Sequence, residues 1–90
     1  MSRQRTIEKI LASEYVTIGE LARLTGCRYS TLKFYTEEGM LPFEQAEENL
    51  TRRYRQAESV ERVAWIREKR EEGKTVPEIK KLLKLQDPGS

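Results

Sequence analysis

Apolar residues recur at helical spacing through most of the chain, and glycines or prolines interrupt the pattern where turns are needed. The clearest pattern covers residues 17–35 and predicts two short helices joined by a tight turn. Thr17 and Glu20 have the spacing of a capping box at the start of the first helix. Its apolar face consists of Ile18, Leu21 and Ala22, with Leu24 beside it.

The second helix follows Gly26, a residue that can adopt the left-handed conformation that ends a helix. Leu32 and Tyr35 point inward in this helix, and an outer face is left to Arg28, Ser30 and Lys33. Two helices with a glycine turn and a polar, basic outer face are typical of a helix-turn-helix, whose second helix enters the DNA major groove. An ordinary helical hairpin in a small α domain is the alternative.

A first helix is predicted over residues 3–14, with an apolar stripe formed by Ile7, Ile10 and Leu11. The stripe predicts that this helix docks on the rest of the domain. Arg3, Arg5 and Lys9 lie on or near its other faces and suggest a second interpretation, a basic arm that reaches the DNA backbone.

Gly39 is expected to end the second helix of the central pair, and Pro42 prevents it from restarting. Met40 and Leu41 are candidate core residues. The helical period then fails over residues 42–56, which read as a loose β-hairpin with an acidic tip. A hairpin strand rich in arginine beside a helix-turn-helix is typical of a wing that contacts phosphates or enters the minor groove.

Two more helices are predicted after the hairpin. The first begins at a cap provided by Glu58 or Ser59 and ends at Gly73, with Trp65 at least half-buried. The second begins with a capping box from Thr75 to Glu78. The buried faces are expected to contain Val60, Val63, Ala64 and Ile66 in the first helix, and Ile79, Leu82 and Leu83 in the second.

Composition limits the functions that are available. The 90 residues carry a net charge of +2, and 36% of them are charged, so charge distribution says more than the total. Residues 37–48 contain five acids and no base, whereas residues 49–57 contain three arginines and no acid.

There is no histidine and only one cysteine, Cys27, for which we expect a structural role in the turn. We therefore expect no metal, no cofactor and no enzymatic activity. A cytoplasmic, nucleoid-associated location is expected, since the sequence contains neither a membrane-spanning run nor a signal peptide.

Taken in order, these segments resemble the DNA-binding domain of the MerR family of bacterial transcription regulators. The matching pieces are TIGELARLTG, STLKFYTEEGMLP, TRRYR, ESVERVAWIREKREEG and TVPEIKKLL. The resemblance implies a mainly α fold, a winged helix-turn-helix with a small β-hairpin wing, two following helices and an extra N-terminal helix. It divides the chain into a helical extension (1–15), the winged domain (16–85) and a disordered tail (86–90).

The resemblance also implies which residues contact DNA. Lys33 stands where the family has an arginine before two aromatic residues, here Phe34 and Tyr35, and Arg53 stands at the wing position that faces DNA. The complete expected set is Thr17, Arg28, Tyr29, Ser30, Lys33, Tyr35, Arg52, Arg53 and Arg55.

Departures from the family pattern bear on these expectations. Arg28 replaces a small capping residue, so the recognition helix is expected to start later, with Ser30 as a possible cap. Arg55 replaces an aromatic residue at the end of the wing strand. Lys69, Glu72 and Lys74 replace apolar residues that pack toward a long dimerisation helix, which has no counterpart in this sequence. We expect a naturally short member, with a domain cut from a longer chain as the alternative.

These observations predict a sequence-specific binder of double-stranded DNA that regulates transcription, as a homodimer or as a head-to-tail oligomer on DNA, with no membrane partner. An architectural accessory factor, for excisionase-like recombination or plasmid partition, would need the same helix and wing. A protein-interaction module is a third possibility, because Glu44, Glu47 and Glu48 would repel phosphate at the tip of the wing.

Overall fold

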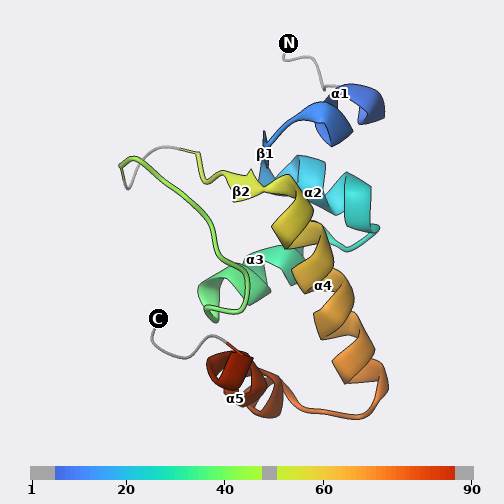
Figure 1. Ribbon diagram of the computed structural model, residues 1–90, viewed down its shortest axis with the longest axis vertical. Coiled ribbons are helices and arrows are strands. Elements are labelled where there is room, and N and C mark those ends of the chain that lie inside the picture. The colour runs from blue at the N-terminus through green and yellow to red at the C-terminus, as the bar shows by residue number, and fades with distance from the viewer. Residues whose placement is uncertain (1–5, 48–50, 87–90) are drawn as a thin grey trace.

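The computed structural model describes residues 6–47 and 51–86, in which five helices and a two-stranded antiparallel sheet surround one apolar core. Figure 1 shows α4 running along the molecule, with α2 packed beside its first half, α3 packed on α2, and α5 beside its far end, where the chain has turned back. The elements are α1 (Ile7–Ala12), β1 (Tyr15–Val16), α2 (Ile18–Thr25), α3 (Tyr29–Glu37), β2 (Tyr54–Arg55), α4 (Gln56–Glu71) and α5 (Val76–Gln86).

The helix-turn-helix begins with the predicted capping box. The Thr17 hydroxyl accepts a hydrogen bond from the backbone N–H of Glu20 at 3.2 Å, and the Thr17 N–H donates to the Glu20 carboxylate at 2.9 Å. The helix ends at Gly26, whose φ of 75° lies in the left-handed region. Both ends of α2 are therefore determined by local sequence, as predicted.

The second helix of the pair, α3, begins at Tyr29 with Arg28 as its N-cap, so the expectation of a later start capped by Ser30 was wrong. Its C-terminal end is a Schellman motif, in which Gly39 has a φ of 77°. The N–H groups of Gly39 and Met40 donate to the carbonyls of Thr36 and Tyr35 at 3.1 and 2.9 Å. This turn sends Met40 into the core, where the side chain is completely buried, as predicted.

The start of α4 corrects another expectation. The helix begins at Gln56, ahead of the predicted caps Glu58 and Ser59, because the N–H of Gln56 donates to the carbonyl of Glu14 at 2.8 Å. Pairing with the N-terminal segment thus determines where α4 starts, and Ser59 is buried in its second turn. The buried face consists of Ser59, Val63 and Ile66, which leaves Ala64 exposed where a buried position was expected.

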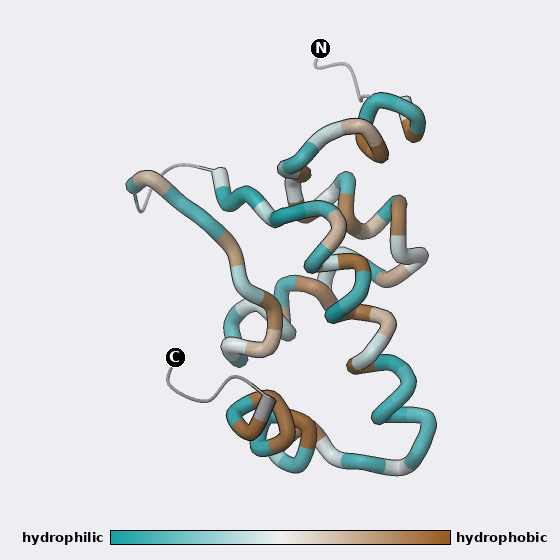
Figure 2. Tube along the Cα trace, in the orientation of Figure 1, coloured by the Kyte–Doolittle hydropathy of each residue, from teal (hydrophilic) through white to brown (hydrophobic). Residues whose placement is uncertain are grey.

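The last helix, α5, starts with the predicted capping box: the N–H of Thr75 donates to the Glu78 carboxylate at 3.0 Å. Ile79 and Leu83 are buried and Leu82 is half-buried, so its predicted inner face is present. Figure 2 shows that the far end of α4, where it leaves the body and turns toward α5, is hydrophilic. The mixed-charge run at the end of α4 is therefore a solvated surface.

The wing is built differently from an independent hairpin. Its outgoing and returning arms are joined by one bridge between Glu44 and Arg53, with backbone N–O distances of 2.7 and 2.8 Å. The returning strand β2 instead pairs with β1, in the register Tyr15–Arg55 and Val16–Tyr54. The sheet thus joins the wing to the segment that precedes the helix-turn-helix, a long-range pairing that the local pattern did not reveal.

The first helix is shorter than predicted and buries less of its apolar stripe. It has six residues, of which Ile10 is fully buried, whereas Ile7 and Leu11 are 40% and 55% exposed. A helix of fewer than two turns offers one short side to α2, so one apolar position reaches the core. Gln86, which was expected to begin the C-terminal tail (86–90), is instead the last residue of α5. Arg3, Arg5 and residues 87–90 lie outside the described residues.

Candidate nucleic-acid interface

The outer face of α3 is the most chemically distinctive surface of the helix-turn-helix. Arg28, Tyr29, Ser30 and Lys33 are all exposed, with Tyr29 at 56%, as the helical pattern predicted. The opposite face contributes Leu32 and other residues to the core. The sequence thus places a basic and hydrogen-bonding group of side chains along the first half of a rigidly packed helix.

Charge changes sign along α3. The basic residues Arg28 and Lys33 occupy its first half, whereas Glu37 and Glu38 occupy its end. Glu38 is held by Lys80 of α5, with an Nζ–Oε1 distance of 3.2 Å. An anionic partner is therefore favoured at the N-terminal half of the helix, where the helix dipole also favours negative charge.

The two aromatic residues after Lys33 point in different directions. Tyr35 is 4% exposed and belongs to the core, whereas Phe34 is 43% exposed. Only the hydroxyl end of Tyr35 could contact a phosphate, and Phe34 adds an exposed ring that the sequence analysis did not include among the contact residues. The i, i+3 spacing of Leu32 and Tyr35 was the signal for this division.

Two arginines of α4 donate hydrogen bonds to the ends of α2 and α3, and the sequence analysis did not identify either of them. Arg67 donates to the carbonyl of Thr25, at the end of α2, at 2.9 Å. Arg62 donates to the carbonyl of Met40, just after α3, at 3.0 Å. Both bonds cross more than 20 residues of sequence, so no local pattern could have identified them.

The turn residue Cys27 is half-buried, and its Sγ lies 4.0 Å from Nη1 of the same Arg67. It packs against the core beside Leu24. Among the described residues, no group of three or more histidine, cysteine or acidic side chains is arranged to hold a metal ion.

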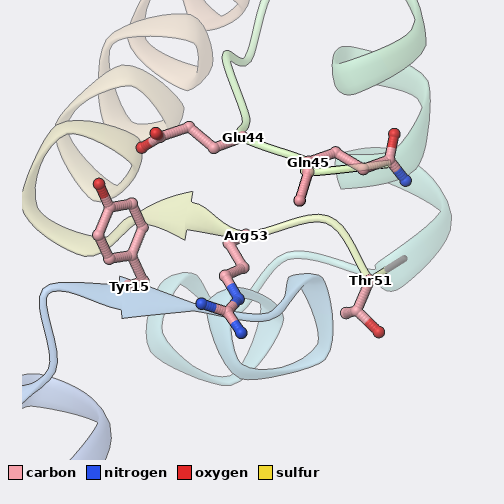
Figure 3. Close-up of a pocket in the computed structure, with 6 residues that line it drawn as sticks. Tyr15, Glu44, Gln45, Thr51 and Arg53 are labelled. Atoms are coloured by element: carbon pink, nitrogen blue, oxygen red, sulfur yellow. The ribbon is translucent and has the colours of Figure 1, made fainter. Parts of the chain in front are cut away.

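The three wing arginines have separate environments. Arg52 lies over the ring of Phe43, with its Cζ 4.8 Å from the ring centroid. Arg53 is exposed and lines an open hollow of about 590 Å³ beside β1, together with Tyr15 and Glu44. Figure 3 shows the guanidinium of Arg53 pointing away from the Glu44 carboxylate.

Arg55 is engaged within the protein. It lies between two carboxylates, 3.6 Å from that of Glu14 and 3.4 Å from that of Glu44, and above the ring of Tyr15 at 5.4 Å. The neighbouring Tyr15 and Glu44 raise the pKa of Arg55 above its ordinary value. The pKa of Tyr15 is also raised, chiefly because its hydroxyl hydrogen-bonds to Glu44, with a smaller contribution from desolvation.

Thr17 is also engaged within the protein, because its hydroxyl accepts the hydrogen bond from the Glu20 N–H in the capping box. Five of the nine expected contact residues are exposed on α3 or on the wing: Arg28, Tyr29, Ser30, Lys33 and Arg53. The other four, Thr17, Tyr35, Arg52 and Arg55, pack or bond within the protein. No helix in the described parts of the chain is long and apolar enough to cross a membrane.

Comparison with known proteins agrees with this arrangement. The family model described as MerR HTH family regulatory protein matches residues 16–86. The mercuric resistance operon regulatory protein of Serratia marcescens is 35% identical over 74 residues, which cover 82% of this chain and 51% of the relative. The chain thus spans about half the length of this curated relative.

Proposed function

The chain belongs to the MerR family of helix-turn-helix regulatory proteins, and on this premise we propose that it is a sequence-specific DNA-binding transcription regulator. The observation that carries the proposal is the exposed, basic first half of α3, held by α2 and by two arginines of α4. Side chains at the start of a recognition helix reach base edges when the helix lies in the major groove.

We propose distinct roles within this surface. Lys33 and Arg28 contact bases or the phosphates next to them, and Tyr29 and Ser30 supply further hydrogen-bonding groups from the same turn of α3. Arg53 contacts the backbone that flanks the major groove, because its guanidinium is exposed on the wing. Phosphate contacts of this kind supply affinity and orientation, and base contacts supply sequence preference.

The proposal is tested by incubating the purified chain with fragmented bacterial DNA at low salt and sequencing the bound fragments. Discrete enrichment is expected. Sites in promoter spacers would support transcription regulation, whereas sites in recombination attachment regions or centromere-like repeats would favour the accessory role. Inverted half-sites would indicate a symmetric dimer and direct repeats a head-to-tail assembly. The absence of enrichment would overturn the DNA-binding proposal and favour a protein-interaction module.

A further inference from the structure

The segment ahead of the family-matched region makes direct contact with the wing. The match begins at residue 16, so α1 and Glu14 lie outside it. Glu14 nevertheless contacts the end of the wing twice. Its carbonyl accepts the hydrogen bond from Gln56, and its carboxylate lies 3.6 Å from Nη1 of Arg55.

Arg55 connects this segment to the other arm of the wing. Its Nε lies 3.4 Å from the carboxylate of Glu44, on the outgoing arm, and its guanidinium covers the ring of Tyr15. The Tyr15 hydroxyl in turn hydrogen-bonds to Glu44. We call these four side chains, Glu14, Tyr15, Glu44 and Arg55, the wing brace, because they link β1, the outgoing arm and the returning arm.

The brace matters because it adds a polar link between the arms beyond the base of the wing, where Phe43 contacts Arg52 and Tyr54. Among the described residues, the backbone link between the wing's two arms is the bridge between Glu44 and Arg53. Glu44 therefore carries both the backbone link to Arg53 and the side-chain link to Arg55. Any shift of the outgoing arm would displace Arg53, whose side chain we assign to the DNA backbone.

We propose that Glu14, from outside the family domain, positions the wing for DNA by holding Arg55 against Glu44 and Tyr15. Arg55 then positions the wing through contacts within the protein and does not contact DNA, although the sequence had suggested it would. At a position where the family commonly has an aromatic residue, this chain has an arginine whose Cζ lies 5.4 Å from the centroid of an aromatic ring, that of Tyr15. The inference rests on the proposed DNA binding, because its consequence is measured there.

DNA titrations over a series of salt concentrations test this assignment, using Glu14→Gln, Arg55→Gln and the double variant. Loss of an exposed acid normally strengthens binding to a polyanion, so weaker binding by Glu14→Gln would be diagnostic. We expect a loss of roughly twofold to fivefold, the range of one exposed ion pair. Glu8→Gln is the matched control, since Glu8 is an acid of α1 that is not among the groups beside Arg55.

The double variant and the salt slope separate positioning from direct contact. If Glu14 acts through Arg55, Glu14→Gln weakens binding no further when Arg55→Gln is already present. Because both substitutions release the same brace, Glu14→Gln and Arg55→Gln should change the log–log salt slope equally. A slope reduced by about one unit in Arg55→Gln but not in Glu14→Gln would place Arg55 on a phosphate and overturn the assignment.

Hydrogen exchange of the free protein gives a readout that needs no DNA. The N–H groups of Glu44 and Arg53 form the bridge between the arms, and we expect both to exchange faster in Glu14→Gln and Arg55→Gln. The N–H of Met40, bonded to the Tyr35 carbonyl, should remain unchanged and serves as the internal reference.

Unchanged exchange at the bridge, or binding by Glu14→Gln as tight as that of the unaltered chain, would overturn the proposal. Failure of the unaltered chain to bind any DNA would instead overturn the proposed function, and the exchange result would still decide whether the brace holds the wing.

Discussion

Thr36 and Tyr54 form a buried hydrogen bond that joins the recognition helix to the wing strand, with 2.9 Å between the two hydroxyl oxygens. The Thr36 hydroxyl donates its proton to the carbonyl of Leu32 at 2.8 Å. Tyr54 must therefore donate to Thr36, since a hydroxyl has only one proton. Tyr54 is completely buried, so this contact fixes the base of the wing against α3.

The direction of that bond predicts unequal costs for its two partners. Tyr54→Phe removes the donor and leaves Thr36 bonded to Leu32, so we expect a loss of about 1 kcal/mol in the free energy of unfolding. Thr36→Val leaves the buried Tyr54 hydroxyl without an acceptor and should cost more, about 1–3 kcal/mol. Urea denaturation of both variants measures the difference. Equal losses would contradict this assignment of donor and acceptor.

Lys33 carries the residue-scale prediction for DNA recognition. If its ammonium contacts a base edge, Lys33→Ala should cost about 1–3 kcal/mol of binding free energy on the preferred site and much less on random DNA. Fluorescence anisotropy with both duplexes measures the two values. Lys81→Ala, an exposed lysine of α5, is the control for the loss of one positive charge. An equal loss on both duplexes would indicate a phosphate contact.

At the scale of the element, α3 combines a poorly capped start with a well-formed end. Arg28 occupies its N-cap without a side-chain hydrogen bond to the first turn, whereas the Schellman motif satisfies the carbonyls at the other end. Serine, threonine, aspartate and asparagine stabilise this position in other helices. On the proposed function, Arg28 destabilises the start of the helix but supplies a positive charge to the proposed DNA-binding surface.

Arg28→Ser tests that trade-off. The serine hydroxyl can accept from an N–H of the first turn, so we expect the free energy of unfolding to increase by about 0.5–1 kcal/mol. DNA affinity should decrease at the same time, because a positive charge is lost at the start of the recognition helix. Thermal denaturation and anisotropy measure the two effects. An increase in both stability and affinity would remove Arg28 from the interface.

The capping box of α5 predicts a dependence of stability on pH. Hydrogen bonds from the Thr75 backbone and hydroxyl hold the pKa of Glu78 below its ordinary value of 4.5. A carboxyl group with a lowered folded-state pKa stabilises the protein above its unfolded value, and this stabilisation is lost as pH falls through the folded pKa. Glu78→Gln should therefore lower the melting temperature at pH 7 and have less effect below about pH 4. A difference independent of pH would show that the charge is not involved.

At the scale of the molecule, α4 links the recognition surface to the rest of the fold. Its hydrogen bonds to Thr25 and Met40 fix the ends of α2 and α3, and its first turn follows directly from the wing strand β2. Helix and wing are therefore attached to one element. Figure 1 shows both on the same body, with the wing extending away from it.

If the proposed DNA-binding surface includes the wing, removing a wing arginine should change the salt dependence of DNA binding, and removing an arginine elsewhere should not. Arg53→Ala should weaken binding to every sequence and reduce the log–log salt slope by about one unit, because one phosphate contact is lost. Arg70→Ala, which removes an exposed arginine from the far end of α4, is the matched control and should leave the slope unchanged. An unaltered slope for Arg53→Ala would exclude Arg53 from the backbone contact.

The sequence by itself determined the elements whose causes are local. Capping boxes at Thr17 and Thr75 and left-handed glycines at residues 26 and 39 mark helix ends, because these interactions span only a few residues. Periodicity likewise divided α3 into a buried face with Leu32 and Tyr35 and an outer face with Lys33. The exposed outer face of α3 could therefore be predicted from the sequence.

Only the tertiary structure decided the features that depend on contacts between distant segments. The pairing of β1 with β2 sets the first residue of α4 and places Arg55 between Glu14 and Glu44, which both precede it by more than 10 residues in the sequence. The sequence marks Arg53 and Arg55 equally as basic strand residues. Their spacing of two residues would place both side chains on the same face of a regular strand, so alternation does not separate them. What separates them is their neighbours, because folding brings Glu14 and Glu44 beside Arg55 and leaves Arg53 open to solvent.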